Sequence, residues 1–105
     1  MITIPYKIEG YSLGPRDLIV LRCMYEKDPS FTGLTAEEIW NLSYAKIFTA
    51  KNNRVYVIKN KAIIYERLNS LISKGLVNRF SNRDRSYLYK LSIDGIILWK
   101  SYSNI

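Results

Sequence analysis

One stretch of the sequence, residues 60–91, limits the possible folds more than any other. A helix is predicted over 60–74, and Gly75 can take the left-handed conformation that commonly ends a helix. The apolar residues of this helix recur at the spacing of one helical face and are Ile64, Leu68, Leu71 and, at the margin, Ile72. Strands are predicted at 76–80 and 87–91, joined by six polar residues. The stretch therefore predicts a helix that passes directly into a hairpin with a charged loop.

Two further helices are predicted before this stretch, and one after it. The first covers 15–27 and begins with proline, which suits the first turn of a helix. Its apolar stripe consists of Leu18, Val20, Leu21, Met24 and Tyr25. The second begins after Thr35, which forms a capping box with Glu38. A short extended segment, 31–34, separates these two helices, and a last helix opens around 92–94.

Residues 45–59 allow two interpretations. β-branched and aromatic residues flank the turn-like pair Asn52 and Asn53, which is typical of a small hairpin. Helical spacing also extends backwards from Ile64 to Val57, so the third helix could instead begin near Arg54. The hairpin is the favoured interpretation. At the N-terminus, alternating apolar and polar residues over 2–8 predict a short extended arm or edge strand.

Charge is distributed unevenly along the chain. The 105 residues include 16 Lys and Arg against 9 Asp and Glu, a net charge of +7. Eleven of the basic residues fall within 45–90, where only Glu66 and Asp84 oppose them, so this segment carries +9 and the remainder −2. A basic half beside a slightly acidic half is typical of a surface that meets a polyanion, although a solvated basic face without a partner has the same composition.

Residue types that most catalytic and metal sites need are absent or rare. The sequence has no histidine and one cysteine, so a zinc or iron ion would find almost no ligands. Glycine-rich phosphate loops, paired carboxylates and nucleophile motifs are also absent. Cys23 has apolar neighbours and is expected to be a buried thiol. An enzyme, a cofactor and a metal site are therefore not predicted.

Three stretches carry a resemblance to a known family. They are LTAEEI at 34–39, LNSLISKGLVNR at 68–79 and YLYKLSIDG at 87–95. In this order they resemble winged-helix DNA-binding domains of the MarR and PadR type, over about residues 15–100. The resemblance implies an α+β winged helix-turn-helix, with a three-helix core, a β-hairpin wing and a C-terminal helix.

The same resemblance suggests how the chain is divided and where it comes from. Residues 1–14 would form an N-terminal arm and residues 15–105 the winged-helix domain. The Ile-, Tyr- and Lys-rich composition is similar to that of small archaeal and archaeal-virus regulators.

The resemblance implies a sequence-specific transcriptional regulator that binds double-stranded DNA, with the helix 60–74 in the major groove. Nine residues of this helix and its approach are predicted to contact DNA. They are Lys59, Asn60, Lys61, Ala62, Ile63, Tyr65, Glu66, Arg67 and Asn69. Asn and Arg can read adenine and guanine, and Ala or Ile can touch a thymine methyl group, while Lys59, Lys61 and Arg67 could equally hold phosphates. Glu66 is unfavourable there unless it accepts from a cytosine or pairs with a neighbour.

Basic residues in two loops are also predicted to contact DNA. Arg83 and Arg85 lie in the hairpin loop, with Arg79 at its base. In the family resembled, this wing approaches the minor groove, whose negative potential in A·T-rich DNA favours arginine. Lys51 and Arg54, in the preceding loop, form a candidate phosphate clamp. That loop is a departure from the family, whose second and third helices are joined by three or four residues, so it could extend the DNA contact or tilt the recognition helix.

A homodimer is expected, because one recognition helix reads only a few base pairs and two-fold pairing doubles the site. Its interface is predicted to combine the N-terminal arm, the helix 15–27 and the final helix. The apolar residues of the final helix that offer surface for it are Ile96, Leu98, Trp99 and Tyr102.

The alternative to DNA binding is a winged-helix protein–protein interaction module of a larger assembly. Such a module needs no basic face. No apolar run approaches the length of a membrane span, and the first residues lack the features of a signal peptide, so a cytoplasmic location without membrane contact is expected.

Overall fold

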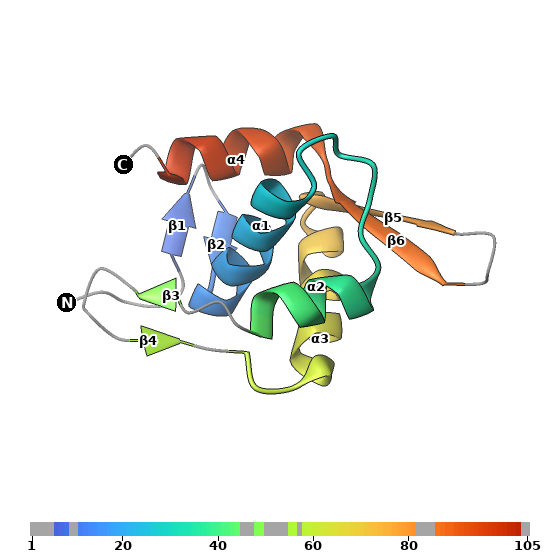
Figure 1. Ribbon diagram of the computed structural model, residues 1–105. Coiled ribbons are helices and arrows are strands. Elements are labelled where there is room, and N and C mark those ends of the chain that lie inside the picture. The colour runs from blue at the N-terminus through green and yellow to red at the C-terminus, as the bar shows by residue number, and fades with distance from the viewer. Residues whose placement is uncertain are drawn as a thin grey trace.

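Four helices and three antiparallel hairpins make up the part of the chain that the computed structural model describes, residues 6–8, 11–44, 48–49, 55–56, 58–81 and 86–103. Their order is β1 (Tyr6–Ile8), β2 (Tyr11–Leu13), α1 (Pro15–Lys27), α2 (Ala36–Tyr44), β3 (Phe48–Thr49), β4 (Val55–Tyr56), α3 (Lys61–Ser73), β5 (Val77–Ser81), β6 (Tyr87–Leu91) and α4 (Ile93–Ser103). Figure 1 shows the hairpin of β5 and β6 projecting from one end of the molecule, while β1–β2 and β3–β4 lie at the other end.

The centre of the fold is α1, which packs against α2, α3 and α4. Eight of its 13 residues are buried, because helices cover it on several sides. Of the predicted stripe, Leu18, Val20, Leu21 and Met24 are buried, and Tyr25 is half-buried against the core. Ile19, outside the prediction, is also buried. The bounds predicted for this helix, 15–27, are confirmed.

The predicted capping box at the start of α2 is confirmed. The Thr35 hydroxyl accepts from the Glu38 backbone N–H at 3.1 Å, and the Thr35 N–H donates to the Glu38 carboxylate at 2.8 Å. These two bonds satisfy backbone donors that have no partner inside the helix. Further along α2, Ile39 is buried, and Trp40 and Leu42 pack against the core from its edge.

The helix α3 and the turn after it also follow the prediction. Asn60 caps the helix, since its side-chain oxygen accepts from the Ile63 N–H at 3.2 Å. The predicted inward residues Ile64, Leu68 and Leu71 are buried, and Ile72, predicted at the margin, is half-buried against the core. Gly75 has φ +77°, and the N–H of Leu76 returns to the Leu71 carbonyl at 3.0 Å. The next strand therefore begins at Val77, one residue later than predicted.

The hairpin interpretation of 45–59 is confirmed, and the early-helix alternative is wrong. Phe48 pairs with Tyr56 and Thr49 with Val55 in antiparallel register, and α3 begins only at Lys61. The strand β1, residues 6–8, lies within the segment 2–8 that was predicted to be extended. Its partner β2, residues 11–13, was not predicted. The division into an arm and a domain at residue 14 stays a prediction.

The wing consists of β5 and β6, in register from Val77 opposite Leu91 to Ser81 opposite Tyr87. Leu34, from the extended segment before α2, forms a two-bond bridge with Tyr89 on β6. The bridge holds the base of the wing against the helices.

The last helix, α4, buries more of its apolar surface than the sequence suggests. Leu98 is fully buried and Trp99 is 7% exposed, while Ile96 and Tyr102 pack against the core. The face of α4 that the sequence analysis offers to a second copy is thus mostly covered by the chain itself. Its exposed apolar residues are instead Ile93 and Ile97. No helix in the described ranges has both the length and the apolar character that crossing a bilayer requires.

Candidate nucleic-acid interface

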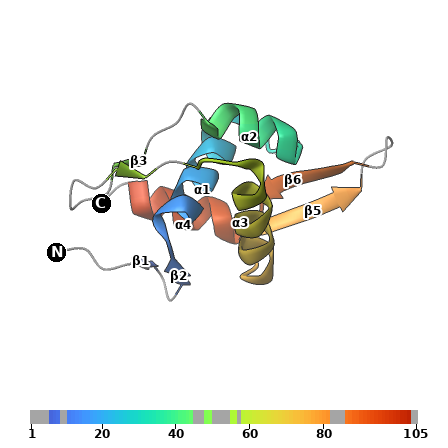
Figure 2. The same ribbon diagram turned by 90° about the horizontal axis from the view of Figure 1, so that it is seen from below.

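The helix α3 lies at the same end of the molecule as the wing, and Figure 2 shows it beside the start of β5. Its side away from the core exposes Ala62, Tyr65, Glu66, Asn69 and Ser73. Lys59 and Asn60, which precede the helix, are exposed as well. Ile63 is different, because its side chain is half-buried and packs against the core.

Lys61, predicted to contact DNA, forms an ion pair with Glu37 on α2. The hydrogen bond to the Glu37 carboxylate raises the pKa of the Lys61 ammonium above its usual value. Both side chains remain substantially exposed, so water screens this pair. The contact nevertheless ties the first turn of α3 to the first turn of α2.

Arg67, the second basic residue predicted on α3, forms an ion pair with Asp17 on α1. Its guanidinium lies 3.3 Å from the Asp17 carboxylate, and Asp17 is only 2% exposed. The other carboxylate oxygen accepts from the Gly14 N–H at 2.9 Å, at the positive end of the α1 dipole. The buried Asp17 carboxylate therefore links α3 to the start of α1.

These two ion pairs leave the outward face of α3 almost without positive charge. Glu66 is exposed on that face and forms no ion pair within the described part of the chain. Both basic residues were predicted to contact DNA, and the structure pairs each of them with a carboxylate. Their partners lie 24 and 50 residues away along the chain, and local patterns carry no signal for such pairs.

On the wing side of α3, Arg79 packs against an aromatic residue of the wing. Its guanidinium lies 4.5 Å from the centre of the Tyr87 ring. Burial raises the pKa of Tyr89, and the charge of Arg79 partly opposes this effect. Tyr87 and Tyr89 line a groove of about 120 Å³ with Tyr65 of α3 and the start of α2. Arg79 and Tyr65 therefore lie on the same side of α3, the side that faces the wing.

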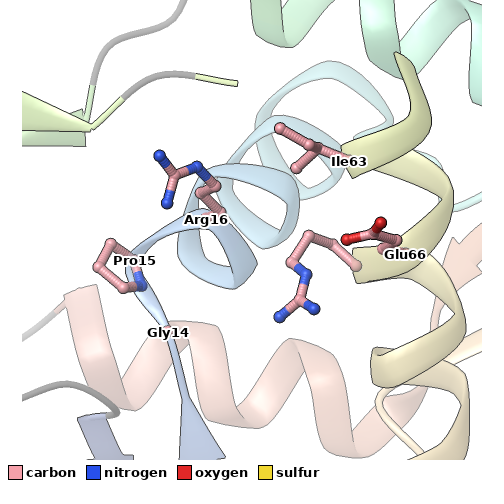
Figure 3. Close-up of a pocket in the computed structure, with 6 residues that line it drawn as sticks. Gly14, Pro15, Arg16, Ile63 and Glu66 are labelled. Atoms are coloured by element: carbon pink, nitrogen blue, oxygen red, sulfur yellow. The ribbon is translucent and has the colours of Figure 1, made fainter. Parts of the chain in front are cut away.

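The opposite flank of α3 holds a larger cleft, of about 360 Å³, against the start of α1. Its lining is formed by Gly14, Pro15, Arg16, Ile63, Glu66 and Arg67. Figure 3 shows Arg16 and Pro15 on one side of this cleft and Ile63 and Glu66 on the other. Arg16 was not among the predicted contacts, because it occupies the first turn of a helix whose apolar pattern indicates a role in the core.

Four predicted contact residues, Lys51, Arg54, Arg83 and Arg85, lie outside the described residues. The strands that flank the first two, β3 and β4, lie at the end of the molecule away from the wing (Figures 1 and 2). Among the described residues, no three His, Cys, Asp or Glu side chains are grouped so that they could hold a metal ion.

The order of three helices, a hairpin and a further helix matches solved structures. MepR, a transcription regulator of the Staphylococcus aureus multidrug efflux pump MepA, superposes with a TM-score of 0.64, over 87% of this chain and 56% of MepR, at 18% identity. The chain is a winged helix. A MepR mutant bound to an oligodeoxyribonucleotide superposes with a TM-score of 0.67 at 17% identity, over 88% of this chain and 56% of the mutant.

A third structure with this winged helix is ZitR from Lactococcus lactis, described as a zinc-responsive MarR family member. Its TM-score is 0.61 at 15% identity, over 98% of this chain and 60% of ZitR. The winged helix thus spans somewhat more than half the length of these proteins. The sequence matches no protein-family model and no curated protein. The neighbours support the predicted fold, α+β with a β-hairpin wing, but give no support to an archaeal or viral source.

Proposed function

We propose that this winged helix binds double-stranded DNA as a transcriptional regulator, with α3 in the major groove and the wing beside the adjacent minor groove. The observation that carries the proposal is the exposed face of α3, which two ion pairs hold at the wing end of the molecule. Two facts add support. Segment 45–90 carries a charge of +9, and a structure of the same fold is bound to an oligodeoxyribonucleotide.

The dimensions of DNA suggest roles for the residues beside α3. A helix with its side chains is roughly 10–12 Å across, and the major groove is about 12 Å wide, so phosphates lie along both flanks of an inserted helix. Arg16 stands on one flank and Arg79 on the other. We assign both to phosphates, with Lys59 at the start of the helix. Lys61 and Arg67 act by positioning α3.

The remaining predicted contacts are part of the same proposal. Arg83 and Arg85, in the wing loop, are assigned to the minor groove, and Lys51 and Arg54 to a phosphate beyond the groove. Tyr65 and Asn60 contribute neutral donors along the α3 side of the interface. A regulator of transcription in this role would act in the cytoplasm.

Arg16→Ala and Arg79→Ala are each expected to weaken binding to duplex DNA about tenfold and to reduce the slope of log affinity against log salt by about one. Fluorescence anisotropy with a labelled duplex over a series of salt concentrations measures both quantities. Lys27→Ala, which removes an exposed charge from the other end of α1, is the control and is expected to change neither.

Two other results would count against this interface. Equal losses for Arg16→Ala, Arg79→Ala and Lys27→Ala would indicate an effect of net charge alone. Absence of binding to any duplex in dilute buffer would exclude the regulator and favour the alternative, a protein–protein interaction module.

We propose that a second copy of the chain covers the exposed isoleucines of α4. Ile93 is 77% exposed and Ile97 is 50% exposed, and their spacing of four residues places them on one side of the helix. Pairing through this side would double the length of DNA that the protein reads.

Sedimentation is expected to give twice the 12.3 kDa mass of one chain at tens of micromolar. Replacing both isoleucines by lysine should restore the single-chain mass, because two charges would have to enter the apolar contact. Asp94→Lys, on the same turn of α4, is the control and should leave the mass doubled. A wild-type protein that sediments as one chain would exclude the pairing.

A further inference from the structure

We propose that Glu66 selects a cytosine, at the centre of a three-base-pair element that α3 reads through Ala62, Glu66 and Asn69. The inference rests on the proposed DNA binding and adds to it the bases that the helix recognises. Three features carry it: the position of the three side chains, the hydrogen bonds that each can form, and the ion pairs of the neighbouring Lys61 and Arg67.

The three residues form one row along the exposed side of α3. All three are exposed, and they face away from the buried Ile64 and Leu68. A helix rises 1.5 Å per residue, so the row from Ala62 to Asn69 is roughly 10 Å long. Successive base pairs are about 3.4 Å apart, so the row matches about three of them. Each side chain can therefore meet a different base pair.

The chemistry of the row distinguishes the bases. A carboxylate only accepts hydrogen bonds, so the acceptor atoms of guanine and of thymine repel Glu66. Adenine offers a donor but places the N7 acceptor beside it, whereas cytosine presents a donor, N4, without that neighbour. Cytosine is therefore the base that suits Glu66. Asn69 suits adenine, whose N6 and N7 it can bond together, and Ala62 suits the thymine methyl group.

The ion pairs around the row leave this carboxylate free to act on DNA. Arg67 is paired with Asp17 and Lys61 with Glu37, and Glu66 forms an ion pair with neither, although it lines one cleft with Arg16 and Arg67. A bare carboxylate near phosphates lowers affinity unless it accepts a hydrogen bond. Glu66 thus penalises every base at its position except the one that donates to it, which makes it a residue for specificity and not for affinity.

Selection of bound duplexes from a random pool tests the inference with the full chain. The wild type is expected to require a cytosine at one position, where any other base weakens binding about tenfold or more. Glu66→Gln should change that position to adenine, because the amide can bond adenine N6 and N7 together, and should leave the other positions unchanged. Asp94→Asn removes the same charge from an exposed site on α4, and should keep the wild-type preference.

The outcomes separate this inference from the proposed function. If Glu66→Gln selects the same sequences as the wild type, or if the wild type enriches no sequence although it binds duplexes, the cytosine assignment is overturned and DNA binding stands. If neither protein retains any duplex at low salt, the proposed function itself fails. A change from cytosine to adenine at one position, absent in Asp94→Asn, supports both.

Discussion

Asp17→Ala is expected to lower the free energy of unfolding by about 3 kcal/mol, measured by urea denaturation. The carboxylate is 2% exposed and accepts from the Gly14 N–H and from Arg67. Alanine leaves the Arg67 guanidinium and the N–H of Gly14, the N-cap residue of α1, without this acceptor in a partly buried place. Since the same pair holds α3, DNA affinity should fall as well.

Glu37→Ala is the matched control, because it also removes one partner of an ion pair between two helices. Both members of the Glu37–Lys61 pair are substantially exposed and screened by water, so the loss should be much smaller than for Asp17→Ala. Equal losses for the two variants would show that burial of Asp17 contributes nothing to holding α3.

The substitution Gly95→Ala should destabilise the protein by about 3 kcal/mol, the upper end for overpacking. A Cβ at Gly95 would lie 2.2 Å from the backbone oxygen of Leu76. That oxygen cannot move aside easily, because it accepts from the Ser92 N–H and the Leu76 N–H is bonded to Leu71. The helix α4 must shift instead. Urea denaturation followed by the fluorescence of Trp99, a nearly buried residue of α4, measures the loss of stability.

Gly75→Ala provides the comparison. Nothing lies within 4 Å of a Cβ at Gly75, so the cost there comes only from the left-handed backbone, φ +77°, and is about 1–2 kcal/mol. A smaller loss for Gly95→Ala than for Gly75→Ala would mean that α4 does not depend on its close approach to Leu76.

The elements that the sequence predicts well are those with local signals. Pro15 and Thr35 mark where α1 and α2 begin, and Gly75 marks the end of α3, because caps and turns depend on residue types a few positions apart. The inward faces of α1 and α3 follow from helical periodicity. The wing follows from two short strands on either side of a polar loop.

The features that the sequence analysis missed depend on residues far apart in the chain. No local pattern indicates that Arg67 faces Asp17 and not DNA, or that Lys61 pairs with Glu37. The burial of Leu98 likewise depends on which face of α4 meets α1. The structure therefore departs from the sequence-based prediction more at the candidate site than in the fold. Its basic residues on α3 support the helix, and Arg16, from another helix, joins its flank.

Ser92 connects three elements at one point. Its hydroxyl donates to the Gly75 carbonyl at 2.7 Å and accepts from the Gly95 N–H at 3.0 Å, while its own N–H bonds Leu76. The end of α3, the start of the wing and the start of α4 are therefore hydrogen-bonded through one residue. In a two-fold pair joined through α4, the direction of that helix would set the distance between the two α3 helices. Two major-groove sites one turn of DNA apart require a distance of about 34 Å. A change in how α4 meets its partner would thus alter operator spacing without touching a residue that contacts a base.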